Sequence, residues 1–161
     1  MARRPTEAMA TNAKAESLFK SILPILESDL GDGITNARQL DSLGRALFKS
    51  EWRGVHAADD IKEAIGDRPA GRGYFIANTD VSTGQGIHGM GIYCDESADR
   101  APLIFDSFGR KTAKALPELR GVGRDTDHDK NQRVAQQDCG SRSMAFLVIA
   151  KYWGYDFAAL L

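Results

Sequence analysis

Apolar residues recur at helical spacing in the first third of the chain. Within residues 13–26, the apolar positions that fall three or four apart are Leu18, Phe19, Ile22, Leu23 and Leu26. This spacing predicts a helix over 13–26, and Pro24 is expected to kink or interrupt it near its end. The pattern predicts a second helix over residues 36–48 and a short helical segment over 57–65. Residues 1–12 are small and polar and predict a loose arm.

The pattern changes to short extended runs in the middle of the chain. "YFIAN" (74–78) is a short apolar run, and "IHGMGIYC" (87–94) alternates between small and apolar positions. "LIFDSF" (103–108) follows after the polar connection "DESADRAP". Adjacent extended runs with a connection of that length predict an antiparallel pair of strands over 87–94 and 103–108.

The last third contains the longest apolar run. "QQDCGSRSMAFLVIAKYW" (136–153) turns from polar to apolar just after Cys139 and predicts a buried helix that begins near this residue. The order of helices, then strands, then a long helix predicts an α+β fold, a small mixed or antiparallel sheet packed with helices. Because 161 residues suffice for one core but hardly for two, residues 13–161 are expected to form one domain.

Composition limits the classes of protein to which this chain can belong. The chain is 42% hydrophobic and 27% charged, with a formal net charge of −1, which gives no support to general nucleic-acid binding. The opening "MARRPTEAMATNAKAES" has no apolar run behind its arginines, so we expect no secretory signal. With only Cys94 and Cys139, a disulfide framework is not expected. No CxxC or HxxxH spacing supports zinc, and neither a metal nor a cofactor is expected.

Cys139 stands where the predicted helix begins rather than among its apolar residues. The first N–H groups of a helix lack intrahelical partners and lie at the positive end of its dipole, and both favour thiolate, the nucleophilic form of cysteine. Gly140 leaves space beside the sulfur. The alternative is a cysteine that simply packs at a helix start.

A nucleophilic cysteine needs a base, and the base usually needs an orienting partner. His88 follows "TGQGI" at the start of a predicted strand, and Asp106 lies inside "LIFDSFG" between Phe105 and Phe108. A carboxylate in such apolar surroundings needs a partner, and an imidazolium suits it. A surface histidine and a turn-capping acid are the alternatives for these two residues.

Together these segments resemble a known family. "FIANTDVSTGQGIHGMGIY", "LIFDSFG" and "NQRVAQQDCG" resemble the adenovirus-type cysteine proteases (adenain) and their relatives in polinton-like and other viruses. The resemblance covers about residues 48–153 and keeps the family's order of His, acid, Gln and Cys. It implies an adenain-like fold, with the catalytic cysteine at the N-terminus of a buried helix.

The resemblance also assigns roles. It makes Cys139 the nucleophile, His88 the general base and Asp106 the orienting acid. Gln132 would donate to the oxyanion together with the backbone N–H of Cys139, although Gln136 and Gln137 also precede the cysteine. The chain departs from the family in two ways. Gly89 stands where the family commonly has Trp, and adenain itself has Glu in place of Asp.

A regular hairpin would separate the expected base from its acid. If Cys94 pairs with Leu103, Gly91 faces Asp106, and His88 lies three residues further, about 10 Å at strand rise. The expected triad then requires a bulge or an asymmetric loop.

Other candidate sites are weaker. "DTDHDKN" (125–131) places acids at alternate positions but lacks the Gly and Glu of a calcium-binding EF-hand, which favours a polar loop. His56 lies near Asp59 and Asp60, which suggests either a metal ligand or a surface histidine. By resemblance, an activating peptide or DNA is a candidate partner, although the near-neutral charge argues against DNA and no motif supports a bond from Cys94 to a peptide.

The sequence therefore predicts a thiol endopeptidase that cleaves viral precursor proteins. By resemblance, its substrates carry small residues, typically glycine, beside the cut, and it acts in the virion or inside the host cell. One alternative is an isopeptidase that removes ubiquitin-like proteins, because those enzymes share the order His, Asp, Gln, Cys. Another is a catalytically degenerate relative with a structural role, for which Gly89 is the best support.

Overall fold

The computed structural model describes residues 5–30, 37–65, 72–78, 89–95, 100–107, 117–119, 121–127 and 139–161. The α-helices in this part of the chain are α1 (Pro5–Leu30), α2 (Ala37–Phe48), α3 (Ile61–Ile65), α5 (Cys139–Trp153) and α6 (Tyr155–Ala158). The strands are β1 (Trp52–His56), β2 (Gly73–Asn78), β3 (Gly89–Cys94), β4 (Leu103–Phe105) and β5 (Arg124–Asp125). Short 3₁₀ turns cover Lys49–Glu51, Ala58–Asp60 and Pro117–Leu119. The fold is mixed α+β, as the order of the predicted elements indicated.

The five strands form one mixed sheet in the order β1-β2-β3-β4-β5. Strand β3 is antiparallel to both of its neighbours, β2 and β4, while β1 is parallel to β2 and β5 is parallel to β4. The antiparallel pairing expected for residues 87–94 and 103–108 is confirmed over the described residues of β3 and β4.

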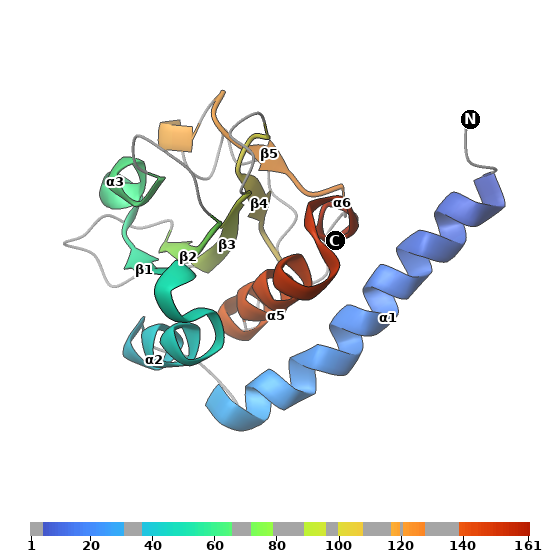
Figure 1. Ribbon diagram of the computed structural model, residues 1–161, viewed down its shortest axis with the longest axis horizontal. Helices are drawn as coiled ribbons and strands as arrows, with labels where there is room; N and C mark the ends of the chain where they lie inside the picture. Colours follow the sequence, from blue (N-terminus) through green and yellow to red (C-terminus); the bar gives the residue numbers. More distant parts are fainter. Residues whose placement is uncertain are drawn as a thin grey trace.

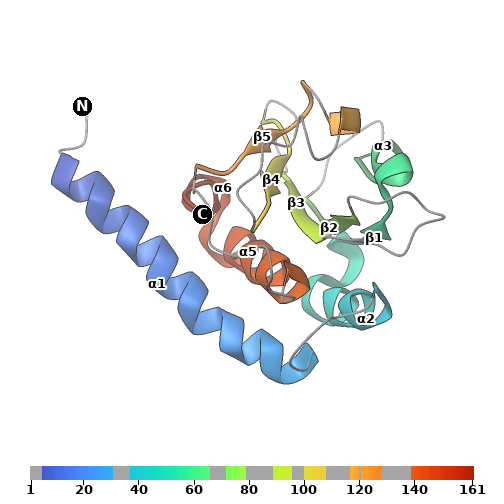
Figure 2. The ribbon, with the colours of Figure 1, turned by 180° about the vertical axis from the view of Figure 1, so that it is seen from behind.

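The sheet separates two hydrophobic clusters. One face packs on α5, which lies between the sheet and the long helix α1 (Figure 1), and the opposite view shows the same layers (Figure 2). The other face packs on α3 and on the 3₁₀ turns Ala58–Asp60 and Pro117–Leu119. Alternate residues of each central strand supply the two clusters, as in Tyr74 and Phe75 of β2. Both faces are therefore covered, which explains why β3 and β4 are buried along their whole length.

Helix α5 runs in the same direction as β3. Near its start, Ser143 bonds to Gly89, and further along, the ring of Phe146 lies against Gly91. Beyond its end, Tyr155 lies near Tyr93, with ring centroids 6.2 Å apart. Cys139, the first residue of α5, is therefore at the end of the sheet where β3 begins.

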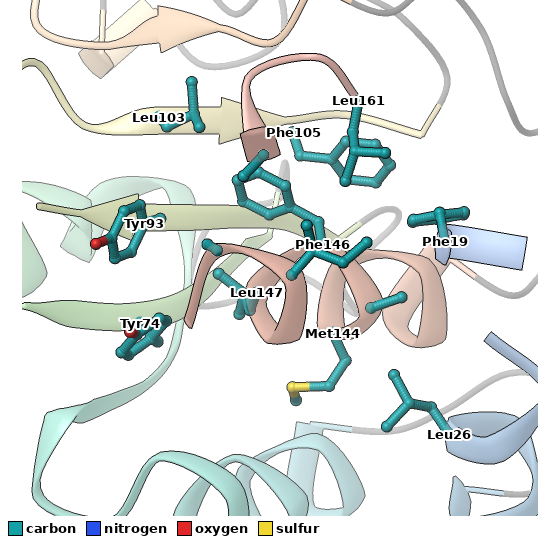
Figure 3. Packing of buried hydrophobic residues seen from close by; sticks show 14 of the residues in the cluster. Phe19, Leu26, Tyr74, Tyr93, Leu103, Phe105, Met144, Phe146, Leu147 and Leu161 are labelled. Atoms are coloured by element: carbon teal, nitrogen blue, oxygen red, sulfur yellow. The ribbon is translucent and has the colours of Figure 1, made fainter. Parts of the chain in front are cut away.

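Aromatic rings fill the opposite end of this interface. Tyr74 stacks on Phe48 with centroids 4.3 Å apart and on Tyr93 at 5.2 Å. Figure 3 shows Tyr74 and Tyr93 on adjacent strands, well separated from Phe105 and Phe146. We call Phe48, Tyr74 and Tyr93 the aromatic end of the sheet.

The first helix is longer than the sequence pattern predicted. It begins at Pro5, so the expectation of a loose arm is wrong for residues 5–12, while residues 1–4 lie outside the described part. Proline is well tolerated in the first turn of a helix, and the Ala, Glu and Met that follow have high helix propensity. Pro24 does not interrupt α1, which continues to Leu30. Leu26 and Leu30 are buried on the far side of Pro24, and their packing stabilises the last turns.

Two strands were not expected from the pattern. The segment Trp52–His56 forms β1, although all five of its residues are only half-buried and a bulge interrupts its pairing. Two residues of the expected polar loop, Arg124 and Asp125, form β5 beside β4. Both strands lie at the edges of the sheet, where neither alternation nor a strong apolar run is required.

Candidate functional site

The start of α5 lies where three elements meet. Asn78, at the end of β2, pairs with Gly89, at the start of β3. The carboxyl end of β4 lies at the same end of the sheet, because Phe105 pairs with Gly91 and Asp106 follows directly. We call this region the Cys139 end of the sheet.

Cys139 is the first residue of α5 and is half-buried. The prediction of a cysteine at the start of a buried helix is thereby confirmed. Gly140 is buried, and a Cβ added there would lie 3.1 Å from Leu40 Cδ2. The glycine therefore lets α2 pack closely against the first turn of α5, beside the cysteine. Cys139 itself is only half-buried, whereas Gly140 and Ser141 after it are buried.

The other cysteine lies in a different environment. Cys94 is 1% exposed and belongs to the cluster on the face of the sheet opposite α5. Its backbone pairs with Gly73 of β2. A buried cysteine in apolar surroundings is poorly reactive. The two thiols thus differ in access to solvent, which makes Cys94 a suitable internal control for Cys139.

Asp106 is a buried carboxylic acid at this end, with a side chain 6% exposed. It lies one residue beyond the last paired residue of β4, Phe105, so the acid ends the strand rather than lying within it. Among the described residues, the buried polar or charged residues are Asp106, Ser107, Ser141 and Ser143. They come from only two segments, the end of β4 and the first two turns of α5. Buried polar groups are costly unless they are bonded, so their concentration makes this end of the sheet the candidate site.

The register between β3 and β4 differs from the expected one. Leu103 pairs with Tyr93 and not with Cys94, so the expected register is wrong by one residue. Continued by one position, the observed pairing brings Asp106 opposite Met90 rather than Gly91. In the sequence, the expected base His88 therefore precedes the residue opposite Asp106 by two positions rather than three.

His88 itself lies outside the described residues, as do Gln132, Gln136 and Gln137. The assignment of His88 as base and that of Gln132 as oxyanion donor stay predictions.

Gly89 stands where the resembled family commonly has Trp, and the structure shows little room for a side chain there. A Cβ added at this buried glycine would lie 3.2 Å from Ile76 Cγ2. A larger residue would require β2 or its side chains to shift. The departure from the family pattern therefore matches the local packing.

Ser143 is a residue of this region that the sequence pattern did not single out. It is fully buried, and its Oγ donates a hydrogen bond to the backbone oxygen of Gly89 at 3.0 Å. The available signal was a small polar residue one turn after Cys139, directly before the apolar run of the helix.

A hollow of about 320 Å³ lies elsewhere, between α2 and β1. Its lining residues are Asp41, Arg45, Lys49, Ser50, Trp52, Arg53 and Gly54. Asp41 accepts hydrogen bonds from Arg45 Nε at 2.9 Å and from Trp52 Nε1 at 2.8 Å. Trp52, which lines this hollow, pairs with Tyr74 at the aromatic end of the sheet. None of the expected catalytic residues is among the lining residues.

For the other expected metal sites, the described part of the chain supplies no additional ligands. His56 contacts the backbone oxygen of Arg53 through Nε2 at 2.5 Å and lies edge-on to Phe75. In the calcium-like segment, Asp127 pairs with Arg124 at 3.4 Å, and residues 128–130 are outside the described residues. No group of three or more His, Cys, Asp or Glu side chains among the described residues is placed to hold a metal ion.

Comparison with known proteins adds no assignment. No model of a known protein family and no curated protein sequence matches this chain. The resemblance to the viral cysteine proteases therefore rests on the quoted motifs. No helix in the described ranges has the length and apolar character that crossing a membrane requires.

Proposed function

We propose that the protein is a cysteine endopeptidase that uses Cys139 as nucleophile, His88 as general base and Asp106 as orienting acid. The observation that carries the proposal is the meeting of elements at the Cys139 end. A half-buried thiol begins a buried helix beside the start of β3 and the end of β4, which adjoin His88 and Asp106 in the chain.

The chemistry follows from this arrangement. The imidazole accepts the proton of the Cys139 thiol, and the thiolate sulfur forms a bond to the carbonyl carbon of the scissile peptide. The N–H of Cys139 and the amide of Gln132 donate to the oxyanion. When the C–N bond breaks, the imidazolium returns its proton to the leaving amine. A water molecule, deprotonated by the imidazole, then attacks the thioester, and the acid product and the thiol are released.

The substrate class comes from the family resemblance. Viral precursor proteins with glycine or another small residue beside the cut are the proposed substrates, and the virion or the interior of the host cell is the proposed location. An activating peptide is a candidate partner. DNA is a weaker candidate, because the net charge of the chain is only −1.

The nearest alternative is an isopeptidase acting on ubiquitin-like proteins, since the order of catalytic residues would be the same. A panel of glycine-containing peptides, compared with a ubiquitin vinyl-sulfone probe, separates the two activities. Cleavage of the peptides with no labelling by the probe is expected for the endopeptidase. Labelling of Cys139 by the probe without peptide cleavage would favour the isopeptidase.

The role of the thiol is tested by substitution. Cys139→Ala should abolish turnover while the melting temperature stays nearly unchanged, because the residue is at a helix edge. Cys94→Ala is the matched control and should retain turnover. In the unmodified protein, iodoacetamide near pH 6 should label Cys139 much faster than Cys94. Equal slow labelling of both thiols, with no peptide cleavage, would leave a structural protein as the better description.

A further inference from the structure

Ser143 connects α5, which carries the proposed nucleophile, with the start of β3, the strand that follows the proposed base in the chain. Its Oγ donates to the backbone oxygen of Gly89 at 3.0 Å, and both residues are buried. Ser143 lies four residues after Cys139, about one helical turn. Gly89 directly follows His88. The bond therefore joins the first turns of α5 directly to the start of β3.

A helical serine has a more common choice of partner. Its hydroxyl can donate to the carbonyl four residues earlier in the same helix. Ser21 of α1 does so, with its Oγ 2.9 Å from the oxygen of Ser17. Ser143 instead reaches across to a strand far away in the sequence. Its hydroxyl thus contributes to the placement of the helix on the sheet.

The neighbouring packing makes this placement tight. A Cβ added at Gly91 would lie 3.0 Å from the backbone oxygen of Ser143 and 2.8 Å from Phe146 Cδ1. Only a glycine lets the backbone of α5 approach β3 this closely. Any sliding of α5 along β3 would have to break the Ser143 bond and leave a buried carbonyl without this donor, which is unfavourable.

We propose that Ser143 is a positioning residue that fixes the distance between the Cys139 thiol and the His88 imidazole; this inference rests on the proposed function. Transfer of the thiol proton to the imidazole creates an ion pair, and its stability depends on separation. A misplacement of about 1 Å at reacting groups can cost roughly 10²-fold in rate. Loss of the Ser143 hydroxyl therefore lowers the fraction of thiolate and slows the attack, with little effect on substrate binding.

The experiment measures the thiol directly. In a Cys94→Ala background, the rate of iodoacetamide labelling is measured near pH 6 and near pH 9, with and without Ser143→Ala. The ratio of the two rates should fall about tenfold in Ser143→Ala, because less thiolate is present at the lower pH. With a cleavable glycine-containing peptide, kcat should fall roughly 10-fold to 10²-fold while KM changes by less than about twofold.

Two further variants separate positioning from loss of stability. Ile104→Val removes one methylene from the cluster on the other face of the sheet, far from Ser143, and should lower the melting temperature without changing the labelling ratio. Ser143→Thr keeps the hydroxyl and should move the ratio back toward that of the unmodified protein. If Ser143→Thr does not fold, Gly91→Ala supplies a second displacement of α5 and should shift the ratio in the same direction as Ser143→Ala.

The outcomes distinguish this inference from the proposed function. A labelling ratio that is high in the unmodified protein and unchanged in Ser143→Ala would overturn the positioning role alone. A low ratio in the unmodified protein, equal to that of a free thiol, would overturn the proposed catalytic pair and with it the role of Ser143.

Discussion

The two ends of the interface between β3 and α5 are built from different side chains. At the Cys139 end, β3 presents Gly89 and Gly91 to the helix, and the backbones approach closely. At the aromatic end, the same face of the same strand presents Tyr93, which stacks with Tyr74 and lies near Tyr155. Over the six residues of β3, the contact with the helical layer therefore changes from close backbone approach to packing of side chains.

This difference explains how the fold accommodates buried polar side chains at the Cys139 end. The aromatic end buries large rings, whose apolar area contributes strongly to stability. The Cys139 end also stacks Phe105 on Phe146, but it contains in addition the buried polar side chains of Asp106 and Ser143. We expect substitutions at the Cys139 end to change turnover more than stability, and substitutions at the aromatic end to do the reverse.

The largest expected effect concerns Asp106. If its carboxylate orients His88, Asp106→Asn should lower kcat by roughly 10²-fold to 10⁴-fold, as in other catalytic triads. The melting temperature should change little, because Asn preserves the shape of the buried side chain. A large fall in melting temperature, with activity retained per folded molecule, would make Asp106 a structural residue and would remove the contrast between the two ends.

The next effect concerns the oxyanion donor. Gln132→Ala should lower kcat by roughly 10²-fold to 10³-fold, the usual loss for one donor. Gln136→Ala and Gln137→Ala are the matched controls and should cost far less, because Gln137 is tied to the chain entering α5. Nearly full activity in Gln132→Ala, with activity lost in either control, would reassign the donor.

A smaller effect is expected from closing the gap at Gly91. Gly91→Ala places a methyl group against Phe146 and the backbone of Ser143, and such overpacking typically costs about 1–3 kcal/mol. The free energy of unfolding is measured by denaturant titration. Combining it with Phe146→Leu should cost less than the sum of the two single changes, since the smaller side chain relieves the crowding. Strict additivity would show that the strand and helix are not in direct contact there.

The smallest effects are expected at the aromatic end, from two tyrosine hydroxyls. Tyr93 Oη donates to Asp95 Oδ1 at 2.9 Å, whereas the buried hydroxyl of Tyr74 has no hydrogen-bond partner among the residues that the structure describes. Tyr93→Phe should therefore lower the free energy of unfolding by about 1 kcal/mol, while Tyr74→Phe should leave it unchanged or raise it by up to about 1 kcal/mol. Turnover should be normal in both. A loss in Tyr74→Phe equal to that in Tyr93→Phe would contradict the difference in hydrogen bonding.

The same tyrosines predict the alkaline limit of stability. Burial, and secondarily the charge of Glu51, raises the pKa of Tyr74 to about 12. Burial, followed by the hydrogen bond to Asp95, also raises the pKa of Tyr93. Because both pKa values are raised above the unfolded value of about 10, the folded state favours the neutral phenols. Stability should be complete below pH 10 and should fall from about pH 10 to pH 12, and Tyr74→Phe should make this fall less steep in pH-dependent unfolding.

Local patterns in the sequence were enough to predict several elements. The polar-to-apolar change at Cys139 predicted the start of α5, because a long apolar run bounded by polar residues must be buried. The short apolar run ending at Asn78 predicted β2 in the same way. These features depend on neighbouring residues, so the local pattern contains the required information.

Other features depend on partners far away in the chain. The register of Leu103 with Tyr93 is set by packing on both faces of the sheet, and a shift of one residue is invisible to a local pattern. The edge strands β1 and β5 exist because β2 and β4 offer them hydrogen-bonding partners. The bond from Ser143 to Gly89 joins residues 54 positions apart. Sequence spacing can predict which residues begin α5, but only the packing of α5 on β3 decides what lies beside the thiol.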